Sequence, residues 1–135
     1  MSAGISISEY FDKDRLTEDI YGISRWGDGL ITVLENGHIG LCQPDNPNSP
    51  PTDLTEIIKN LDQRGITAPV LLRVTNFLRS RIDQINVSFN AAIDELAYKG
   101  KYRGVFPVKV NQQAPVVDRI VEFGRSYDFG LEVGS

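Results

Sequence analysis

Residues 102–110 read YRGVFPVKV, a short apolar run between Gly100 and the polar stretch that begins at Asn111. A second apolar run, PVLLRV, covers Pro69–Val74, and a third, FGLEV, covers Phe129–Val133. Short, nearly continuous apolar runs are typical of strands that are covered on both faces. We therefore expect three buried strands in the second half of the chain.

Helical patterns separate these three runs. Apolar residues recur at helical spacing from Leu78 to Leu96, and Gly100 is expected to stop that helix. Pro115 stands near the start of a second helix, which Gly124 ends. The alternation of strand and helix predicts an α/β fold with a parallel sheet and right-handed crossovers. Three strands do not close a barrel, so the sheet is either small and open or the start of a larger (β/α) barrel.

The last residues bear on that choice. The sequence closes on DFGLEVGS, where an apolar strand runs into a turn of small residues and the next helix is expected to begin. A domain seldom ends at such a point. We therefore expect a partial sequence that contains the opening of a larger (β/α) barrel.

The first half of the chain has a different pattern. Residues 1–19 are polar and acidic, with a short helix expected around Ile7–Leu16. In residues 21–44, short runs of Ile, Val and Leu are interrupted by Gly, Asn and Asp. This rhythm predicts two or three antiparallel strands, with a hairpin turn at Glu35–Gly37.

A loop and a short helix join the two halves. Gln43–Asp53 contains four prolines, which exclude regular structure. Asp53, with Glu56 three residues on, is expected to cap a short helix that Gly65 ends. We therefore divide the chain into an N-terminal segment at 1–43, a linker and short helix at 44–68, and the beginning of a barrel at 69–135.

Composition restricts the classes of function. The chain has 135 residues, of which 41% are hydrophobic and 24% charged, as in ordinary globular proteins. A net charge of −4 without a basic stripe argues against nucleic acid and against an anionic membrane surface. Cys42 is the only cysteine, so no intrachain disulfide is possible, and neither a signal peptide nor a membrane span is recognisable. We expect a cytoplasmic protein.

Lys109 is the candidate for chemistry, because it lies in an apolar strand. On a strand, Val105, Pro107 and Lys109 share one face. If that face lines a barrel, the amine is desolvated and becomes the uncharged nucleophile that condenses with an aldehyde. Barrels place active sites at the C-terminal ends of their strands, where Lys109 lies. The alternative is a strand-end lysine whose ammonium extends to solvent. In either case Pro107 requires a bulge or a local gap in strand pairing.

Three more residues are candidates for the rim of such a site. Asn111 and Gln112 follow the lysine directly and could bind a cofactor or hold the lysine, although Asn111 could equally cap the next helix. Glu132 ends the third strand and could pair with Lys109 or with substrate, or be solvated.

The remaining reactive residues form no motif. His38 is the only histidine and is expected on the surface of the hairpin, while Cys42 is expected to be a buried thiol. Arg25 and Trp26 lie in the region expected to form strands, where they would pack or face a partner. No phosphate-binding glycine loop or CxxC pair is present, so the sequence gives no support for nucleotide or zinc binding.

Taken together, the segments 21–44, 71–93, 102–112 and 129–135 resemble the biosynthetic, pyridoxal-phosphate (PLP)-dependent arginine decarboxylases. VFPVKVNQ looks like the family's Schiff-base motif, which implies that PLP is bound to Lys109. The resemblance implies a (β/α)8 barrel of the alanine-racemase type, preceded by antiparallel strands that belong to a β-domain. It extends over almost the whole chain beyond roughly the first twenty residues.

The resemblance also implies an activity. Such enzymes convert L-arginine to agmatine and carbon dioxide in polyamine and spermidine biosynthesis, with magnesium beside PLP, and they act as homo-oligomers. The residues that bind the phosphate, the pyridine nitrogen and the guanidinium group lie downstream in that family, so this chain alone is expected to be inactive. Another basic amino-acid decarboxylase of the same fold, a noncatalytic PLP-binding protein and a structural domain with an incidental Lys109 remain the alternatives.

Overall fold

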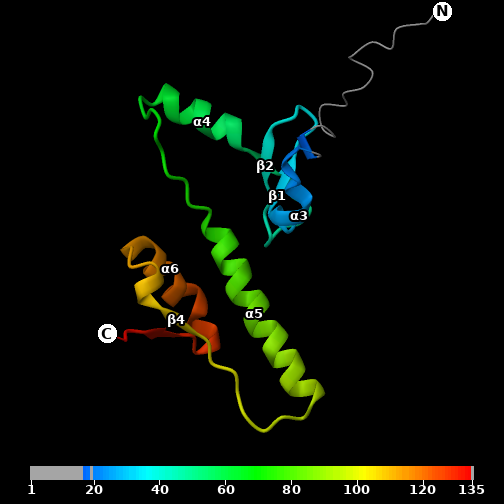
Figure 1. The fold of residues 1–135 in the computed structure, drawn as a ribbon, viewed down its shortest axis with the longest axis vertical. Helices are drawn as coiled ribbons and strands as arrows, with labels where there is room; N and C mark the ends of the chain where they lie inside the picture. Colours follow the sequence, from blue (N-terminus) through cyan, green and yellow to red (C-terminus); the bar gives the residue numbers. More distant parts are fainter. Residues whose placement is uncertain (1–16, 19, 135) are drawn as a thin grey trace, which may run out of the picture. The chain divides into compact units, whose positions relative to one another are not determined.

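The computed structural model describes residues 17–18 and 20–134. The chain divides into two compact units, with the boundary between Leu72 and Arg73 (Figure 1). We describe each unit by itself. The helix expected around Ile7–Leu16 lies outside the described residues.

The first unit contains a small antiparallel sheet. Its strands are β1 (Ile31–Val33), β2 (Ile39–Leu41) and β3 (Thr52–Asp53), in the order β1-β2-β3. Both pairings are antiparallel, and Ile31 lies opposite Leu41. The turn between β1 and β2 needs a residue in the left-handed region, which Gly37 supplies at a φ of 80°. The predicted antiparallel strands and their hairpin turn are confirmed.

Part of the region expected to form strands is helical instead. Residues Ile23–Gly27 form the short helix α3, which contains both Arg25 and Trp26. Gly22, at a φ of 57°, turns the chain into this helix, and Ile23 is buried with only 2% of its surface exposed. The helix packs against β1. Burial against the sheet therefore outweighs the weak strand preference of this stretch.

Helix α4 (Leu54–Gln63) begins and ends as the sequence predicts. Asp53 Oδ1 accepts hydrogen bonds from the backbone N–H groups of Thr55 at 2.8 Å and of Glu56 at 3.4 Å. Gly65 follows the helix with a φ of 75°. Asp53 is therefore both the last residue of β3 and the N-cap of α4.

A polar cluster connects the hairpin turn to the start of α4. Asp53 Oδ2 lies 2.7 Å from His38 Nδ1 and accepts a hydrogen bond from Asn36 Nδ2 at 3.2 Å. Burial would raise the pKa of the Asp53 carboxyl, but hydrogen bonds from His38, Asn36 and the helix N–H groups outweigh it and lower the pKa to about 2. His38 is thus not a freely solvated surface residue, since its side chain is 34% exposed and paired. Cys42, expected to be buried, is half-buried.

The second unit contains a parallel strand pair and two long helices. Its elements are α5 (Thr75–Glu95), β4 (Val105–Pro107), η1 (Val108–Val110), α6 (Ala114–Gly124), η2 (Arg125–Tyr127) and β5 (Gly130–Glu132). Strand β4 pairs with β5 in parallel, and α6 is the crossover between them. The predicted parallel pairing through a helix is confirmed.

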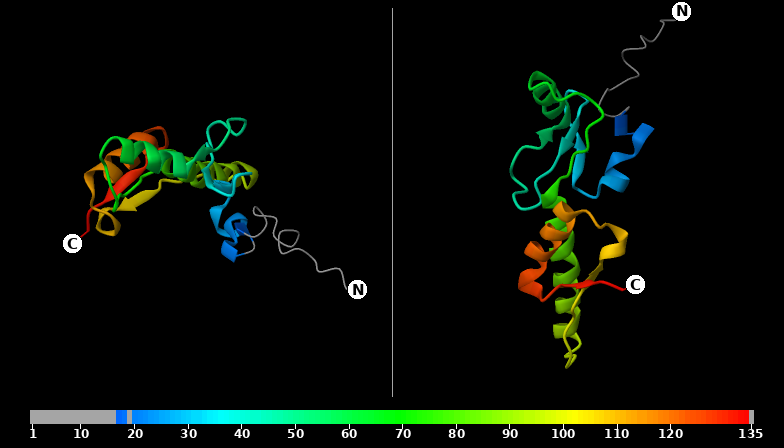
Figure 2. Two further views of the ribbon diagram at one scale, coloured as in Figure 1. Left: turned by 90° about the horizontal axis from the view of Figure 1, so that it is seen from above. Right: turned by 90° about the vertical axis from the view of Figure 1, so that its left-hand side faces the viewer.

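The core of the second unit lies where α5 packs on α6 (Figure 2). Ile82 of α5 is 5% exposed and Ile120 of α6 is 2% exposed. Asn86, at 1%, is a buried polar residue one turn beyond Ile82, and its Nδ2 donates to the Ile82 carbonyl at 2.8 Å. Gly124 is required by close packing, because a Cβ there would lie 2.6 Å from Phe129 Cβ.

Two predictions for this unit are wrong. Pro69–Val74 forms no strand. Within residues 17–18 and 20–134 no other strand pairs with it, and a strand without a partner would leave its backbone N–H and C=O groups without hydrogen bonds. Helix α5 does not continue to Gly100. Instead Ala97 adopts a φ of 48°, and Tyr98 N donates to the Ile93 carbonyl at 2.9 Å, which closes the helix without a glycine.

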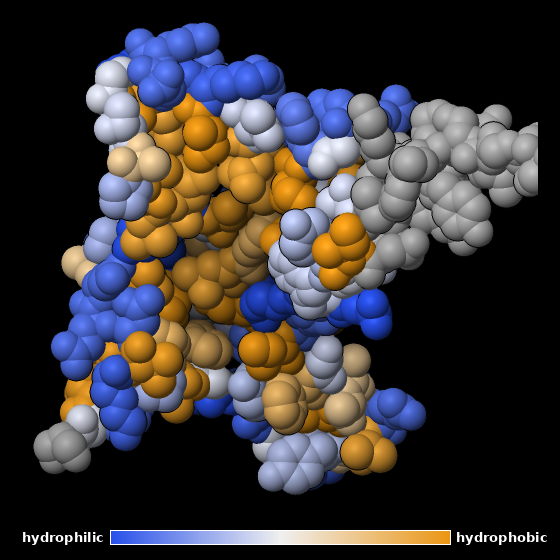
Figure 3. Space-filling model, turned by 45° about the horizontal axis from the view of Figure 1, so that its top comes forward, coloured by the Kyte–Doolittle hydropathy of each residue, from blue (hydrophilic) through white to orange (hydrophobic). Residues whose placement is uncertain are grey.

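Large hydrophobic side chains remain exposed in this part of the chain. Leu71 is 71% exposed, Val105 of β4 is 58% exposed and Phe89 of α5 is 49% exposed. Figure 3 shows hydrophobic residues spread over wide areas of the surface. Exposed apolar area of this extent is characteristic of a surface that another part of a protein covers.

Two isoleucines of α5 provide a test of the core. Ile82→Ala should lower the free energy of unfolding by about 2–5 kcal/mol, because it leaves a cavity in a packed site. The matched control is Ile85→Ala on the same helix, where Ile85 is 44% exposed and the loss should be about 1 kcal/mol or less. Urea unfolding of both variants measures the difference, and equal losses would contradict the assignment of the core.

The Asp53 cluster predicts a dependence of stability on pH. Because the folded-state pKa of Asp53 is lowered from 3.8 to about 2, the stabilisation is present above pH 3.8 and is lost as the pH falls toward 2. Asp53→Asn retains a helix cap but removes the charge. Thermal unfolding should therefore show wild type more stable than this variant at pH 6, with the difference shrinking toward pH 2. A difference that does not change with pH would be the opposite outcome.

Candidate active site

Lys109 lies just beyond the end of β4 and not within the strand. The strand ends at Pro107, and Val108–Val110 form the 3-10 turn η1, so the predicted alternation of Val105, Pro107 and Lys109 on one face does not hold. Proline has no N–H to donate to a neighbouring strand, which ends the ladder at this point. The Lys109 side chain is exposed. Among the described residues it makes no ion pair.

Parallel pairing brings the ends of both strands to one edge of the sheet. Pro107 is the register partner of Glu132, so Glu132 lies at the same edge as the turn that carries Lys109. The Glu132 carboxylate does not pair with Lys109. Its Oε1 instead accepts a hydrogen bond from Gly134 N at 2.5 Å. The two residues are therefore brought to one edge without being joined.

Asn111 closes the turn on itself. Its N–H donates to the Val108 carbonyl at 3.1 Å, and its Oδ1 accepts from Gln113 N at 3.1 Å. Gln113, not Asn111, is the N-cap of α6. Gln112 is exposed between them. The capping role considered for Asn111 is thus replaced by a bond within the turn.

A fifth polar residue at this edge, Arg73, was not predicted from the sequence. Arg73, which lies two residues before α5, donates a hydrogen bond to Gln113 Oε1. Both Arg73 and Asn111 line a cavity of about 290 Å³ with a largely apolar wall, formed by Val74, Leu78, Pro115 and Val116. A guanidinium within the apolar run PVLLRV was the signal that could have identified it.

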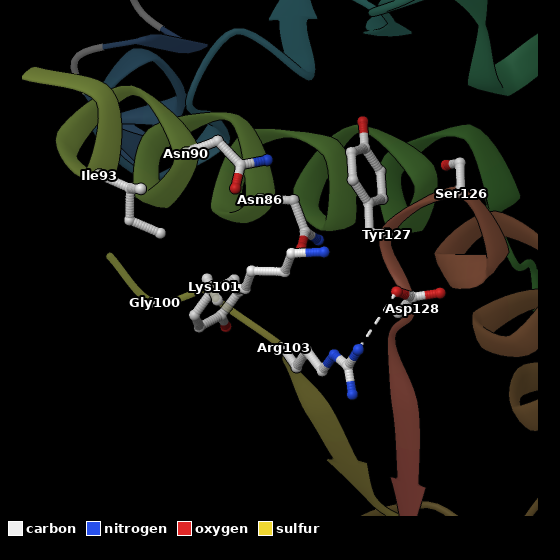
Figure 4. Close-up of a pocket in the computed structure, with 10 residues that line it drawn as sticks. Asn86, Asn90, Ile93, Gly100, Lys101, Arg103, Ser126, Tyr127 and Asp128 are labelled. Carbon is white, nitrogen blue, oxygen red and sulfur yellow. Dashed lines mark ion pairs between the residues drawn. The ribbon is translucent and has the colours of Figure 1, made fainter. Parts of the chain in front are cut away.

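A second cavity, of about 270 Å³, lies at the opposite edge, where β4 and β5 begin (Figure 4). The side chain of Arg103 points toward Asp128, and the ion pair measures 3.8 Å. Tyr127 Oη donates to Asp83 Oδ1 at 2.9 Å, and this hydrogen bond, followed by burial and the Asp83 charge, raises the Tyr127 pKa. Lys101 also lines this cavity, without an ion pair among the described residues. The bond from Tyr127 to Asp83 joins α5 to the segment before β5, so this edge contributes to the packing of α5.

The described part of the chain offers neither a metal site nor a membrane-spanning helix. Within residues 17–18 and 20–134, no group of three or more His, Cys, Asp or Glu side chains is placed to hold a metal ion. Over the same residues, no helix combines the length and the apolar character that crossing a membrane requires.

Comparison with known proteins finds homologues for most of the chain. It is 40% identical, over 86% of its length, to the biosynthetic arginine decarboxylase of Prochlorococcus marinus (strain MIT 9303). The identity is 41% over 86% of the chain for the protein of that name from Synechococcus sp. (strain RCC307) and 40% over 88% for the one from Thermosynechococcus vestitus (strain NIES-2133 / IAM M-273 / BP-1). No family model matches the chain.

The matched region is a small part of each relative. The chain spans 18% of the length of these three arginine decarboxylases. The resemblance inferred from the sequence is therefore confirmed as homology to one part of biosynthetic arginine decarboxylases.

Proposed function

We propose that this chain is the N-terminal part of a biosynthetic arginine decarboxylase, a lyase that converts L-arginine to agmatine and carbon dioxide in polyamine biosynthesis. The observation that carries the proposal is 40% identity over 86% of the chain to proteins with that name. The position of Lys109 directly after a parallel strand supports it, since (β/α) barrels have their active sites at the C-terminal ends of strands.

The proposal includes the fold of the whole protein. We infer that β4, α6 and β5 are part of a (β/α)8 barrel of the alanine-racemase type and that β1–β3 belong to a β-domain. The exposed Leu71 and Val105 support this inference, because the interior and outer layer of a closed barrel would cover such side chains. The segments 1–43, 44–68 and 69–135 would then be the β-domain segment, the linker and the barrel.

We propose PLP as the cofactor and Lys109 as the residue that holds it. The chemistry of the side chain fits, because Lys109 carries a primary amine that no carboxylate engages among the described residues, and an uncharged amine condenses with an aldehyde. When bound, PLP supplies an electron sink for the electrons released as the carboxylate leaves. Magnesium also stays a prediction, because the described residues contain no group of three or more His, Cys, Asp or Glu side chains that could hold a metal ion.

The residues of this chain would hold and orient the reacting amine. Lys109 Nζ would hold the cofactor, and the same amine would be placed to accept or donate a proton at this edge. Asn111 fixes the turn through hydrogen bonds of its N–H and of its side-chain Oδ1, and Gln112 is exposed at the rim. Glu132 lies on the neighbouring strand end, where a carboxylate can bind a cation. We propose that the whole protein is a cytoplasmic homo-oligomer and that this part alone is inactive.

Borohydride reduction tests the assignment of Lys109. In the full-length protein with PLP, reduction should fix the cofactor covalently to Lys109, because the link between the amine and the aldehyde becomes irreversible. Peptide mass spectrometry locates the label. A matched control is Lys99→Ala, which removes an exposed lysine ten residues earlier and should leave the label in place. A label on another lysine in the wild type would refute the assignment.

Substitution of Lys109 provides a second test. Lys109→Ala should lower kcat of the full-length enzyme by at least about 10²-fold, the lower end of what a positioned proton-transferring side chain contributes. Lys109→Arg should fail almost as badly, because a guanidinium keeps its charge but does not form the link. Agmatine formation from L-arginine measures both. Near wild-type activity of Lys109→Arg would show that only a positive charge is needed there.

A further inference from the structure

The turn that carries Lys109 is held mainly by bonds within itself. Asn111 bonds to Val108 and to Gln113, and the Gln113 carbonyl accepts from Val116 N at 2.9 Å in the first turn of α6. These bonds determine the shape of the turn. They do not determine where the turn lies relative to helix α5.

Packing holds α5 against α6 around Ile82 and Ile120, beyond the first turn of each helix. Between the start of α5 and the start of α6 lies the cavity of about 290 Å³ whose wall includes Val74, Leu78 and Val116. An empty space has no atoms on one side to contribute contacts, so its lining side chains do not press the two helix starts into one arrangement. At this end of the two helices, a direct bond would add to what the packing farther along provides.

The Arg73 side chain bridges the two segments. Its guanidinium donates to Gln113 Oε1, across 40 residues of sequence, and Arg73 itself lines the cavity. Among the described residues this is the one side-chain hydrogen bond that joins the stretch Val108–Gln113 to another segment of the chain. No carboxylate of the described residues engages Arg73, so its donors are directed at the neutral amide of Gln113.

We propose that Arg73 is a positioning residue for Lys109: it anchors the Lys109-bearing turn to the start of α5 through Gln113. The inference rests on the proposed function, because the turn matters only if Lys109 reacts. Arg73 does not touch the reacting amine. It acts through Gln113 and Asn111, whose backbone bonds fix the turn. A guanidinium suits this task because its donors lie in a rigid plane.

The expected effect follows from geometry. Misplacing a reacting group by about 1 Å costs up to about 10²-fold in rate. A hydrogen bond from a charged donor corresponds to roughly a 10-fold change. We therefore expect Arg73→Gln to slow the formation of the PLP link at Lys109 by about 10-fold, and to lower kcat more than it raises KM for L-arginine.

The experiment uses full-length protein stripped of PLP and then mixed with it. The rate at which borohydride-fixed label accumulates on Lys109 is measured for wild type, Arg73→Gln, Arg73→Lys and Gln113→Ala. Arg73→Lys should be intermediate, because an ammonium reaches the amide without the planar donor set. The matched control is Arg119→Gln, which removes another guanidinium from the same cavity, but one paired with Glu122 on its own helix. The control should label at the wild-type rate.

A double-mutant cycle separates positioning from general destabilisation. If Arg73 acts through Gln113, the Arg73→Gln and Gln113→Ala variants combined should be no slower than either alone. Additive effects, or an Arg73→Gln rate equal to that of the Arg119→Gln control, would overturn the inference. If Arg73→Gln does not fold, as judged by thermal unfolding, Gln113→Ala alone decides, since it removes the same bond from the other side.

Failure of this inference differs from failure of the proposed function. A wild-type protein labelled at Lys109 at the same rate as Arg73→Gln and Gln113→Ala would refute the role of Arg73 and leave the decarboxylase proposal standing. A wild-type protein that takes up no label at Lys109 would refute both.

Discussion

The arrangement of the candidate site depends on where the ladder between β4 and β5 ends. Pro107 is the last paired residue of β4 because it has no N–H to offer, and the chain turns immediately into η1. Lys109 is therefore presented from a turn at the C-terminal edge and not from the face of a strand. The same pairing sets Glu132 opposite Pro107, which places two chemically different side chains at one edge.

The two edges of this small sheet differ in the way they use charge. At the edge where the strands begin, Arg103 pairs with Asp128 at the surface, and Tyr127 bonds to Asp83 of α5, while Lys101 has no ion pair among the described residues. At the edge where they end, Lys109 and Arg73 have no acidic partner among the described residues. This division fits a (β/α) barrel, in which the active site lies at the C-terminal ends of the strands and the opposite edge contributes to stability.

The second unit buries few side chains because its sheet has only two strands among the described residues. Ile82 and Ile120 are enclosed between α5 and α6, whereas Phe89 and Val105 remain largely exposed. A pair of strands offers two open edges and little area to cover. The chain spans 18% of its arginine decarboxylase relatives, so most of the protein that would cover such a surface in them lies beyond the matched region.

The sequence by itself determined the local elements: the hairpin at Gly37, the Asp53 cap, α5 and α6, and the parallel order of β4 and β5, because turn residues, caps and hydrophobic periodicity act over a few residues. Only the tertiary structure decided the helix at Ile23, the missing strand at Pro69–Val74, and the contacts of His38 with Asp53 and of Arg73 with Gln113. Those depend on which distant segments meet and on whether a strand finds a partner, and neither is encoded in spacing along the chain.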